Sequence, residues 1–370
     1  MKKIFFLFSI FVLITACSSS DGETTTSNDG YDRTALLTHW ANNIIVPAYT
    51  NYQVKLQTLT TDATTFTTTP TEANLVTVRA SWLEAYKAFQ YVSLYNFGKA
   101  EDIYFKERNN TYPADAAGIN TNITAGTYNF SLLSQFSKQG LPALDYVLNG
   151  LGSTDATIVS FYIGSNATNY KKYLTDLVVS LKTINDTVLN DWNGGYKATY
   201  IANNGNTLTS SVSVTVNDYI KNFEKDVRGG KLGIPSGVFS SGTTFPEKVE
   251  AFYKKDVSGI LYTTAIQASQ DFFNGKSFND NTTGPGLKAY LDFVKSVRSG
   301  QNLSDIITAQ FATIYSKVGL LNSNFVTQIT TDNSKMITAY DATQQNVIYL
   351  KLDMMQALKI TVDYVDSDGD

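Results

Sequence analysis

Apolar residues recur every three or four positions along most of this chain, the spacing that places them on one face of an α-helix. The clearest apolar stripe consists of Tyr170, Leu174, Leu177, Leu181, Ile184 and Val188. The same spacing predicts helices over residues 33–60, 71–97, 168–192, 212–227, 246–274, 286–298, 303–322 and 333–358. Only "SVSVTV", residues 211–216, alternates as a strand would, and it merges into a helical stripe. The pattern therefore predicts an all-α protein built from long helices.

Three interruptions divide this helical pattern. Pro47 is expected to kink or break the first helix, because proline lacks a backbone N–H. The threonine-rich segment 60–71 is expected to form a loop, with Thr71 as the N-cap of the next helix. Residues 190–211 are rich in Gly, Asn and Ser and show no helical period, so we expect them to separate two domains. We therefore predict two helical bundles, over residues 31–195 and 196–370.

The N-terminus has the pattern of a lipoprotein leader. "MKKIFFLFSIFVLITACSSS" begins with two lysines, continues with a short apolar run and reaches Cys17 directly after small residues. This pattern predicts a signal peptide over residues 1–16 and lipid attachment at Cys17, since the apolar run is too short for a stable membrane span. Residues 17–30 are expected to form a lipidated flexible tether. We therefore expect a cell-envelope protein, anchored by lipid to the outer membrane and facing the periplasm or the cell surface.

Charge and cysteine content exclude several functions. The chain carries 29 basic and 33 acidic residues and no basic run, which excludes nucleic acid as a partner, because that affinity depends on neutralising phosphates. Cys17 is the only cysteine, so a lipidated chain keeps no thiol for a disulfide or a nucleophile.

One segment has the signals of a well-defined helix start. In "SKQGLPALDYVLNG", residues 137–150, Pro142 suits the first turn of a helix and Gly150 suits the position after its end. An acid in the first turn, here Asp145, is favoured by the helix dipole by about 0.3–1 kcal/mol. This stability is a sufficient structural reason for the acid, so a reaction centre does not follow from the segment alone.

A second segment, "RGGKLGIPSG" (residues 228–237), combines glycines with positive charge. It lacks the Gly-Lys-Ser/Thr ending of a phosphate-binding loop and does not follow a strand, so nucleotide binding is not expected. We interpret it as a loop between helices. It either packs tightly or lines a shared site, where Arg228 and Lys231 would meet a ligand.

Several short motifs in a fixed order resemble those of the imelysin-like proteins, which include the imelysin peptidases and iron-regulated lipoproteins. They are "IVPAY" (45–49), "RASWLEAYKAF" (79–89), "FGKAEDIYF" (97–105), "TYPAD" (111–115), "GLPALDYVLNG" (140–150), "RGGKLGIPSG" (228–237) and "ALKITVDYVDSDGD" (357–370). The resemblance implies two helical bundles related by an internal duplication, with a cleft between them. It also implies an envelope lipoprotein tied to iron or haem uptake.

The chain departs from the signature of that family, Gly-x-His-x-x-Glu. Gly140 matches, but Pro142 stands in place of the histidine and Asp145 in place of the glutamate. A proline nitrogen within a peptide bond cannot bind a metal, so we expect neither a metal nor another cofactor. The single histidine, His39, is expected to be a surface or packing residue, and the final acids from Asp366 to Asp370 a solvated tail rather than a calcium site.

Three functions remain open at this stage. We favour a non-catalytic protein that binds an unknown small ligand and passes it to an outer-membrane receptor or uptake complex. The alternatives are a peptidase of the imelysin type, which the missing histidine disfavours, and a structural docking module of an envelope complex. The favoured function predicts a ligand-binding cleft formed by Trp82, Tyr112, Gly140, Pro142, Asp145, Arg228, Lys231 and Ser236.

Overall fold

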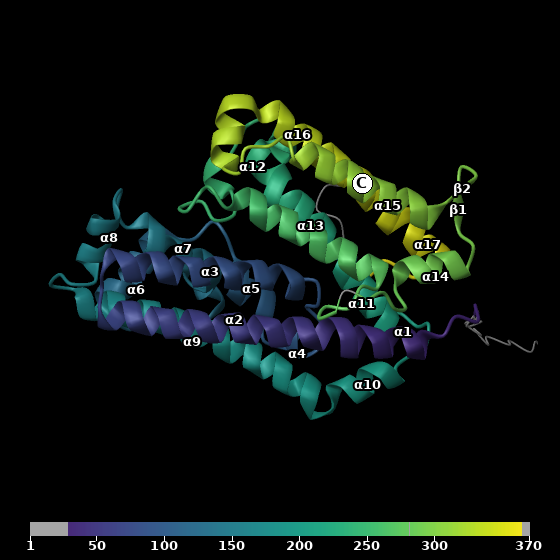
Figure 1. Ribbon diagram of the computed structural model, residues 1–370, viewed down its shortest axis with the longest axis horizontal. Coiled ribbons are helices and arrows are strands. Elements are labelled where there is room, and N and C mark those ends of the chain that lie inside the picture. Colours follow the sequence, from purple (N-terminus) through teal and green to yellow (C-terminus); the bar gives the residue numbers. More distant parts are fainter. Residues whose placement is uncertain (1–28, 281, 365–370) are drawn as a thin grey trace, which may run out of the picture.

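Two stacks of long helices run side by side along the molecule (Figure 1). The computed structural model describes residues 29–280 and 282–364. Within this range the only strands are β1 (Val297–Arg298) and β2 (Gln301–Asn302), which form a small antiparallel hairpin. The predicted all-α fold is confirmed. Cys17 and the acids from Asp366 to Asp370 lie outside the described residues.

The helices divide between a first half and a second half of the chain. Those of the first half are α1 (Arg33–His39), η1 (Trp40–Ile45), α2 (Val46–Thr68), α3 (Glu72–Val92), α4 (Lys99–Asp102), α5 (Phe105–Asn110), α6 (Ala116–Ala125), η2 (Leu133–Lys138), α7 (Gly140–Asp145), η3 (Tyr146–Gly150), α8 (Asp155–Phe161), α9 (Ala167–Asp191), η4 (Trp192–Tyr196) and α10 (Lys197–Ala202). Those of the second half are α11 (Ser211–Lys221), η5 (Asn222–Gly233), α12 (Ile234–Ser236), η6 (Val238–Ser240), η7 (Pro246–Lys248), α13 (Ser258–Asn274), α14 (Leu287–Phe293), α15 (Leu303–Val318), α16 (Phe325–Ile348), η8 (Tyr349–Met354) and α17 (Met355–Ala357).

The core of the first half forms where α2 packs against α3 and α9. The expected stripe of α3 is buried throughout: Leu75, Val78, Trp82, Ala85, Phe89 and Val92. The stripe of α9 is buried as well, except that Tyr170 is only partly covered. Burying one large apolar side chain contributes about 1.5–3 kcal/mol, so these stripes explain why both helices form here.

The structure changes two expectations at the first helix. Pro47 does not break the chain, because the π-helical η1 runs directly into α2. The carbonyl of Asn43, four residues before Pro47, accepts from the backbone N–H of Phe278 at 2.8 Å in place of the missing proline N–H. The expected loop over 60–71 is wrong, since α2 continues to Thr68. Its threonine hydroxyls donate back to carbonyls one turn earlier, as Thr60 does to Leu56 at 2.8 Å. Thr71 is confirmed as the next N-cap.

Two expectations in the second half are also wrong. The glycine-rich segment 228–237 is not a loop, because it is helical as far as Ser236. The π-helix η5, which is wider than an α-helix, covers it to Gly233, and the short α-helix α12 continues it. Gly237, whose φ is +82°, ends that helix. The expected helix over 246–274 begins only at Ser258. Before it, the chain turns through Ala251 and Lys255, whose φ angles of 57° and 68° interrupt any helix.

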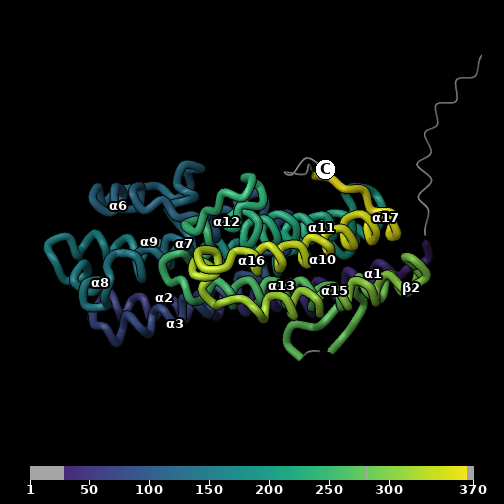
Figure 2. The backbone as a smooth tube through the Cα atoms, turned by 90° about the horizontal axis from the view of Figure 1, so that it is seen from above, coloured from purple at the N-terminus to yellow at the C-terminus, as the bar shows by residue number. Residues whose placement is uncertain are grey.

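The two halves meet along their length and are offset, with α6 and α8 at one end and α15 and α17 at the other (Figure 2). Helix α3 of the first half packs against α13 of the second. The buried His39 joins them too: its Nε2 lies 2.8 Å from the carbonyl oxygen of Gly275 at the end of α13. His39 is therefore a packing residue.

The expected division at residue 195 falls at a kink. Gly195 has a φ of +138° inside η4, and α10 continues beyond it to pack against α1. The exact division into bundles and their origin by duplication stay predictions. Among the described helices, none is both long and apolar enough to cross a bilayer.

Candidate functional site

The start of α7 is a closely packed corner, which we call the α7 corner: Trp82, Gly140, Pro142 and Asp145. Gly140 has a φ of +80°, and a Cβ atom there would lie 2.4 Å from the carbonyl oxygen of Asn109. Only glycine lets α7 approach the end of α5 this closely. Trp82 fixes the same turn, because its Nε1–H donates to the carbonyl of Leu141 at 3.0 Å.

Asp145 at this corner binds the second half of the chain. Its carboxylate is buried and accepts the backbone N–H groups of Tyr253 at 2.8 Å and Lys254 at 2.9 Å. The Asn149 amide donates to it at 3.1 Å. Burial raises the pKa of Asp145 to about 7, although these three donors lower it. The residue therefore holds the segment before α13 against α7.

The α7 corner does not fit a transition metal. Pro142 is buried and has no donor atom, and both oxygens of Asp145 already accept N–H groups from the protein. In residues 29–280 and 282–364, no three His, Cys, Asp or Glu side chains are grouped so that they could hold a metal ion.

A cavity of about 390 Å³ opens beside this corner, between the two halves. Its walls come from α3, α5, the turn 111–113, η5 and Lys248. The lining combines apolar side chains, Phe89, Val227 and Ile234, with polar ones, among them Gln90, Asn110 and four lysines. A concave site with an apolar wall and a few converging polar groups is the usual form of a small-molecule site, and this volume falls within the ~300–1,000 Å³ typical of them.

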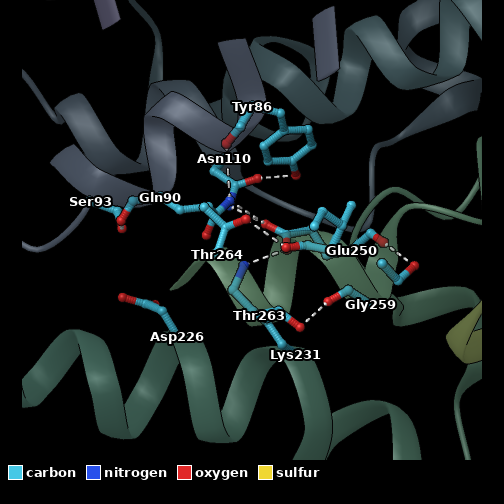
Figure 3. Close-up of polar contacts among 12 residues, drawn as sticks. Tyr86, Gln90, Ser93, Asn110, Asp226, Lys231, Glu250, Gly259, Thr263 and Thr264 are labelled. Carbon is cyan, nitrogen blue, oxygen red and sulfur yellow. Dashed lines mark hydrogen bonds and ion pairs between the residues drawn. The ribbon is translucent and has the colours of Figure 1, made fainter. Parts of the chain in front are cut away.

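A buried network supports the polar side of the cavity (Figure 3). The carboxylate of Glu250 pairs with the ammonium of Lys231, and both side chains are at most 4% exposed. It also accepts from the amide of Asn110 at 2.8 Å, and the Tyr86 hydroxyl donates to Asn110 in turn. Burial and then the charge of Glu250 raise the pKa of Tyr86 well above its ordinary value, so its hydroxyl remains a donor.

The remaining cavity lysines differ in their partners. Lys106 pairs with Asp226 at 2.8 Å. Burial lowers the pKa of Lys106, but the charges of Asp226 and Asp218 outweigh it, and the pKa lies above its ordinary value. The Lys225 ammonium lies 5.3 Å from the ring centre of Tyr364. This wall is therefore held in part by ion pairs.

The structure places two of the expected cleft residues, Tyr112 and Lys231, in the cavity wall. Arg228 lies in a separate buried cluster, where Glu224 also accepts from Lys351 at 3.0 Å. Ser236 is buried in α12 and donates to the carbonyl of Leu232 at 2.7 Å. These two residues and the α7 corner are not among those that line the cavity.

Sequence reasoning missed Lys106, Asn110, Lys248 and Glu250. The first two follow "FGKAED" on a short helix, and the last two lie in a segment that we expected to be helical. A charged residue in such a segment suggests a solvated face, and only tertiary contacts place the segment at the cavity: η7 packs against α12 and α16, and Asp145 binds Tyr253 and Lys254.

Comparison with known proteins agrees with this architecture. The family model described as Imelysin matches residues 45–351. The chain belongs to the imelysin family. Among curated protein sequences, none matches this imelysin-family chain.

Two solved structures share the fold of this family member. One is an imelysin-like protein from Psychrobacter arcticum 273-4, with a TM-score of 0.70 and 18% identity over 90% of this chain and 97% of that chain. The other, from Parabacteroides distasonis ATCC 8503, is provisionally named an iron-regulated protein A precursor. Its TM-score is 0.70 and its identity 15%, over 88% of this chain and 94% of that chain.

Proposed function

We propose that this imelysin-like chain is a non-catalytic lipoprotein of the cell envelope that binds a small ligand in the cavity between its halves. The observation that carries the proposal is the cavity itself, because it joins an apolar wall to converging amides and lysines. The α7 corner offers no comparable group, since Asp145 is already saturated by backbone donors. Binding without chemistry is therefore the function that suits these side chains.

We propose further that the ligand serves iron or haem uptake and that the protein passes it to an outer-membrane receptor or uptake complex. The name of the Parabacteroides distasonis protein, an iron-regulated protein, supports this link. Lipid attachment at Cys17 would keep the protein beside such a partner. Replacing Cys17 by serine is expected to release the protein from the membrane fraction.

Native mass spectrometry of the purified protein, challenged with a ligand panel that includes haem and ferric chelates, tests the binding function. Ile234 lines the cavity and is 40% exposed, so Ile234→Trp should fill the cavity without disturbing the core. Leu352 is 59% exposed and lies outside the cavity, so Leu352→Trp is the matched control. We expect one ligand to bind the wild type and Leu352→Trp but not Ile234→Trp. Equal binding by all three proteins would contradict the proposal.

Growth of the source cell tests the iron link separately. A strain without the protein is expected to grow slowly when haem or chelated ferric iron is the only iron source, and Ile234→Trp should not restore growth. Normal growth of that strain would overturn the iron link and leave the binding function standing.

A further inference from the structure

We infer that the cavity selects a small aromatic carboxylate, an inference that rests on the proposed ligand-binding function. The first reason is the sign of the charge around the cavity. Lysines 106, 225, 231 and 248 line it, and Asp226 is the only lining carboxylate among the described residues. When Glu250 and Asp218 behind the lining are counted with Asp226, the four lysines still outnumber these three carboxylates. An anionic ligand is therefore attracted, and a cation or a bare metal ion is repelled.

The second reason is the state of Lys248. Lys231 and Lys106 have carboxylate partners, Glu250 and Asp226. Within the described residues no carboxylate lies within ion-pair distance of Lys248, whose Nζ instead lies 4.0 Å from the ring centre of Phe245. The side chain is only half-buried, so its ammonium can turn toward a bound anion. Lys248 is thus the group that meets the carboxylate.

The third reason is the apolar part of the cavity lining. Phe89, Val227 and Ile234 belong to it, together with the ring of Tyr112. Aromatic rings pack well against such a lining, because they bury large flat apolar areas and make offset or edge-to-face contacts with other rings. A ligand with a flat apolar body and one carboxylate therefore matches both the apolar side chains and the lysines of the lining.

Three compounds of one shape and different charge test this inference: 2-naphthoate, 2-naphthamide and 2-naphthamidine. We measure their binding to the full chain by isothermal titration calorimetry. An interaction with a charged donor makes naphthoate bind at least about tenfold more tightly than the neutral amide, and the cationic amidine should bind most weakly. Added salt should weaken the binding of naphthoate and not that of the amide.

Lys248→Gln is the decisive variant. We expect it to reduce naphthoate affinity about tenfold and to leave naphthamide affinity unchanged. Lys55→Gln is the control, because Lys55 lines a different groove and already pairs with Glu84. Unchanged melting temperatures establish that both variants are folded.

Equal affinities for the three compounds, binding of none of them, or full naphthoate affinity in Lys248→Gln would overturn the inference. If naphthamide binds as well as naphthoate and Ile234→Trp blocks both, the anion preference is wrong and the proposed binding function stands. If the broader ligand panel also yields no ligand, the binding function fails too.

Discussion

The α7 corner and the cavity both lie where the two halves meet, yet they use their polar groups in opposite ways. At the corner, Asp145 is buried and saturated by the N–H groups of Tyr253 and Lys254. In the cavity, Lys248 has no carboxylate partner among the described residues, and its ammonium lies 4.0 Å from the ring centre of Phe245. The corner therefore joins the halves, and the cavity is left with polar groups that a ligand can use.

In this chain, the positions of the family signature therefore differ from the residues proposed to bind a ligand. Gly140 and Asp145 occupy two of the three signature positions and make contacts that the fold needs. Pro142 removes the imidazole without disturbing the turn, because proline suits the first turn of a helix. The corner is therefore a structural junction in this chain, and the proposed binding is tested at the lysines of the cavity.

The largest expected effect comes from Lys231→Met. Lys231 lines the cavity, but its ammonium is buried in an ion pair with Glu250, much as Asp145 is buried among its donors at the corner. The change leaves the buried carboxylate of Glu250 without its ammonium, which should lower the free energy of unfolding by about 3–5 kcal/mol. Urea denaturation measures it. Combining the change with Glu250→Gln removes the unpaired charge and should restore more than half of the loss. No loss in the single variant would show that the pair is not buried as described.

Gly140→Ala tests the close packing of the corner. The added Cβ would collide with backbone atoms of α5, and the positive φ also disfavours alanine, so we expect a loss of about 3 kcal/mol. Gly194→Ala is the control, since nothing lies within 4 Å of the added atom, and it should change stability by less than about 0.5 kcal/mol. Equal melting temperatures for the two variants would contradict the close approach of α7 and α5.

Asp145→Ala tests the junction itself. The backbone N–H groups of Tyr253 and Lys254 lose their acceptor, which should cost about 2 kcal/mol. Asp256→Ala, at a 60% exposed side chain that pairs with Lys254, should cost less than about 0.5 kcal/mol. Denaturant titration distinguishes them, and similar losses in both would mean that Asp145 does not join the halves.

The pH dependence of stability gives a smaller effect for each pH unit. Because burial raises the pKa of Asp145 from 3.8 to about 7, the folded chain holds this proton more tightly than the unfolded chain. The resulting stabilisation is complete below about pH 4 and is lost as the pH rises to about 7, at no more than about 1.4 kcal/mol per pH unit.

Asp145→Asn should remove this contribution. The fall of the unfolding free energy with rising pH should persist in part, because burial also raises the pKa of Asp218 to about 7. Unfolding free energies measured from pH 4 to pH 8 test this expectation. An identical slope in wild type and Asp145→Asn would place the pKa of Asp145 near its ordinary value.

Much of the fold could be predicted because α3 and α9 bury regular apolar stripes, and periodicity alone reveals such stripes. The second part of η5, from Arg228 onward, could not, because its glycines look like loop residues until Tyr112 is seen packed against Gly230. At the site, Tyr112 and Lys231 were expected and do line the cavity. Lys248 and Glu250 were missed, because their segment is positioned by contacts distant in the sequence, such as that of Asp145 with Tyr253, 108 residues later.

Comparing Lys248→Gln with Asp145→Asn in one calorimetric titration with 2-naphthoate tests the central claim most directly. We predict opposite effects of the two variants on affinity and on melting temperature. Lys248→Gln should lose about tenfold in affinity and keep its melting temperature, whereas Asp145→Asn should melt earlier and keep its affinity at a temperature where it is folded. Lost affinity in folded Asp145→Asn, with full affinity in Lys248→Gln, would place binding at the α7 corner and contradict the account.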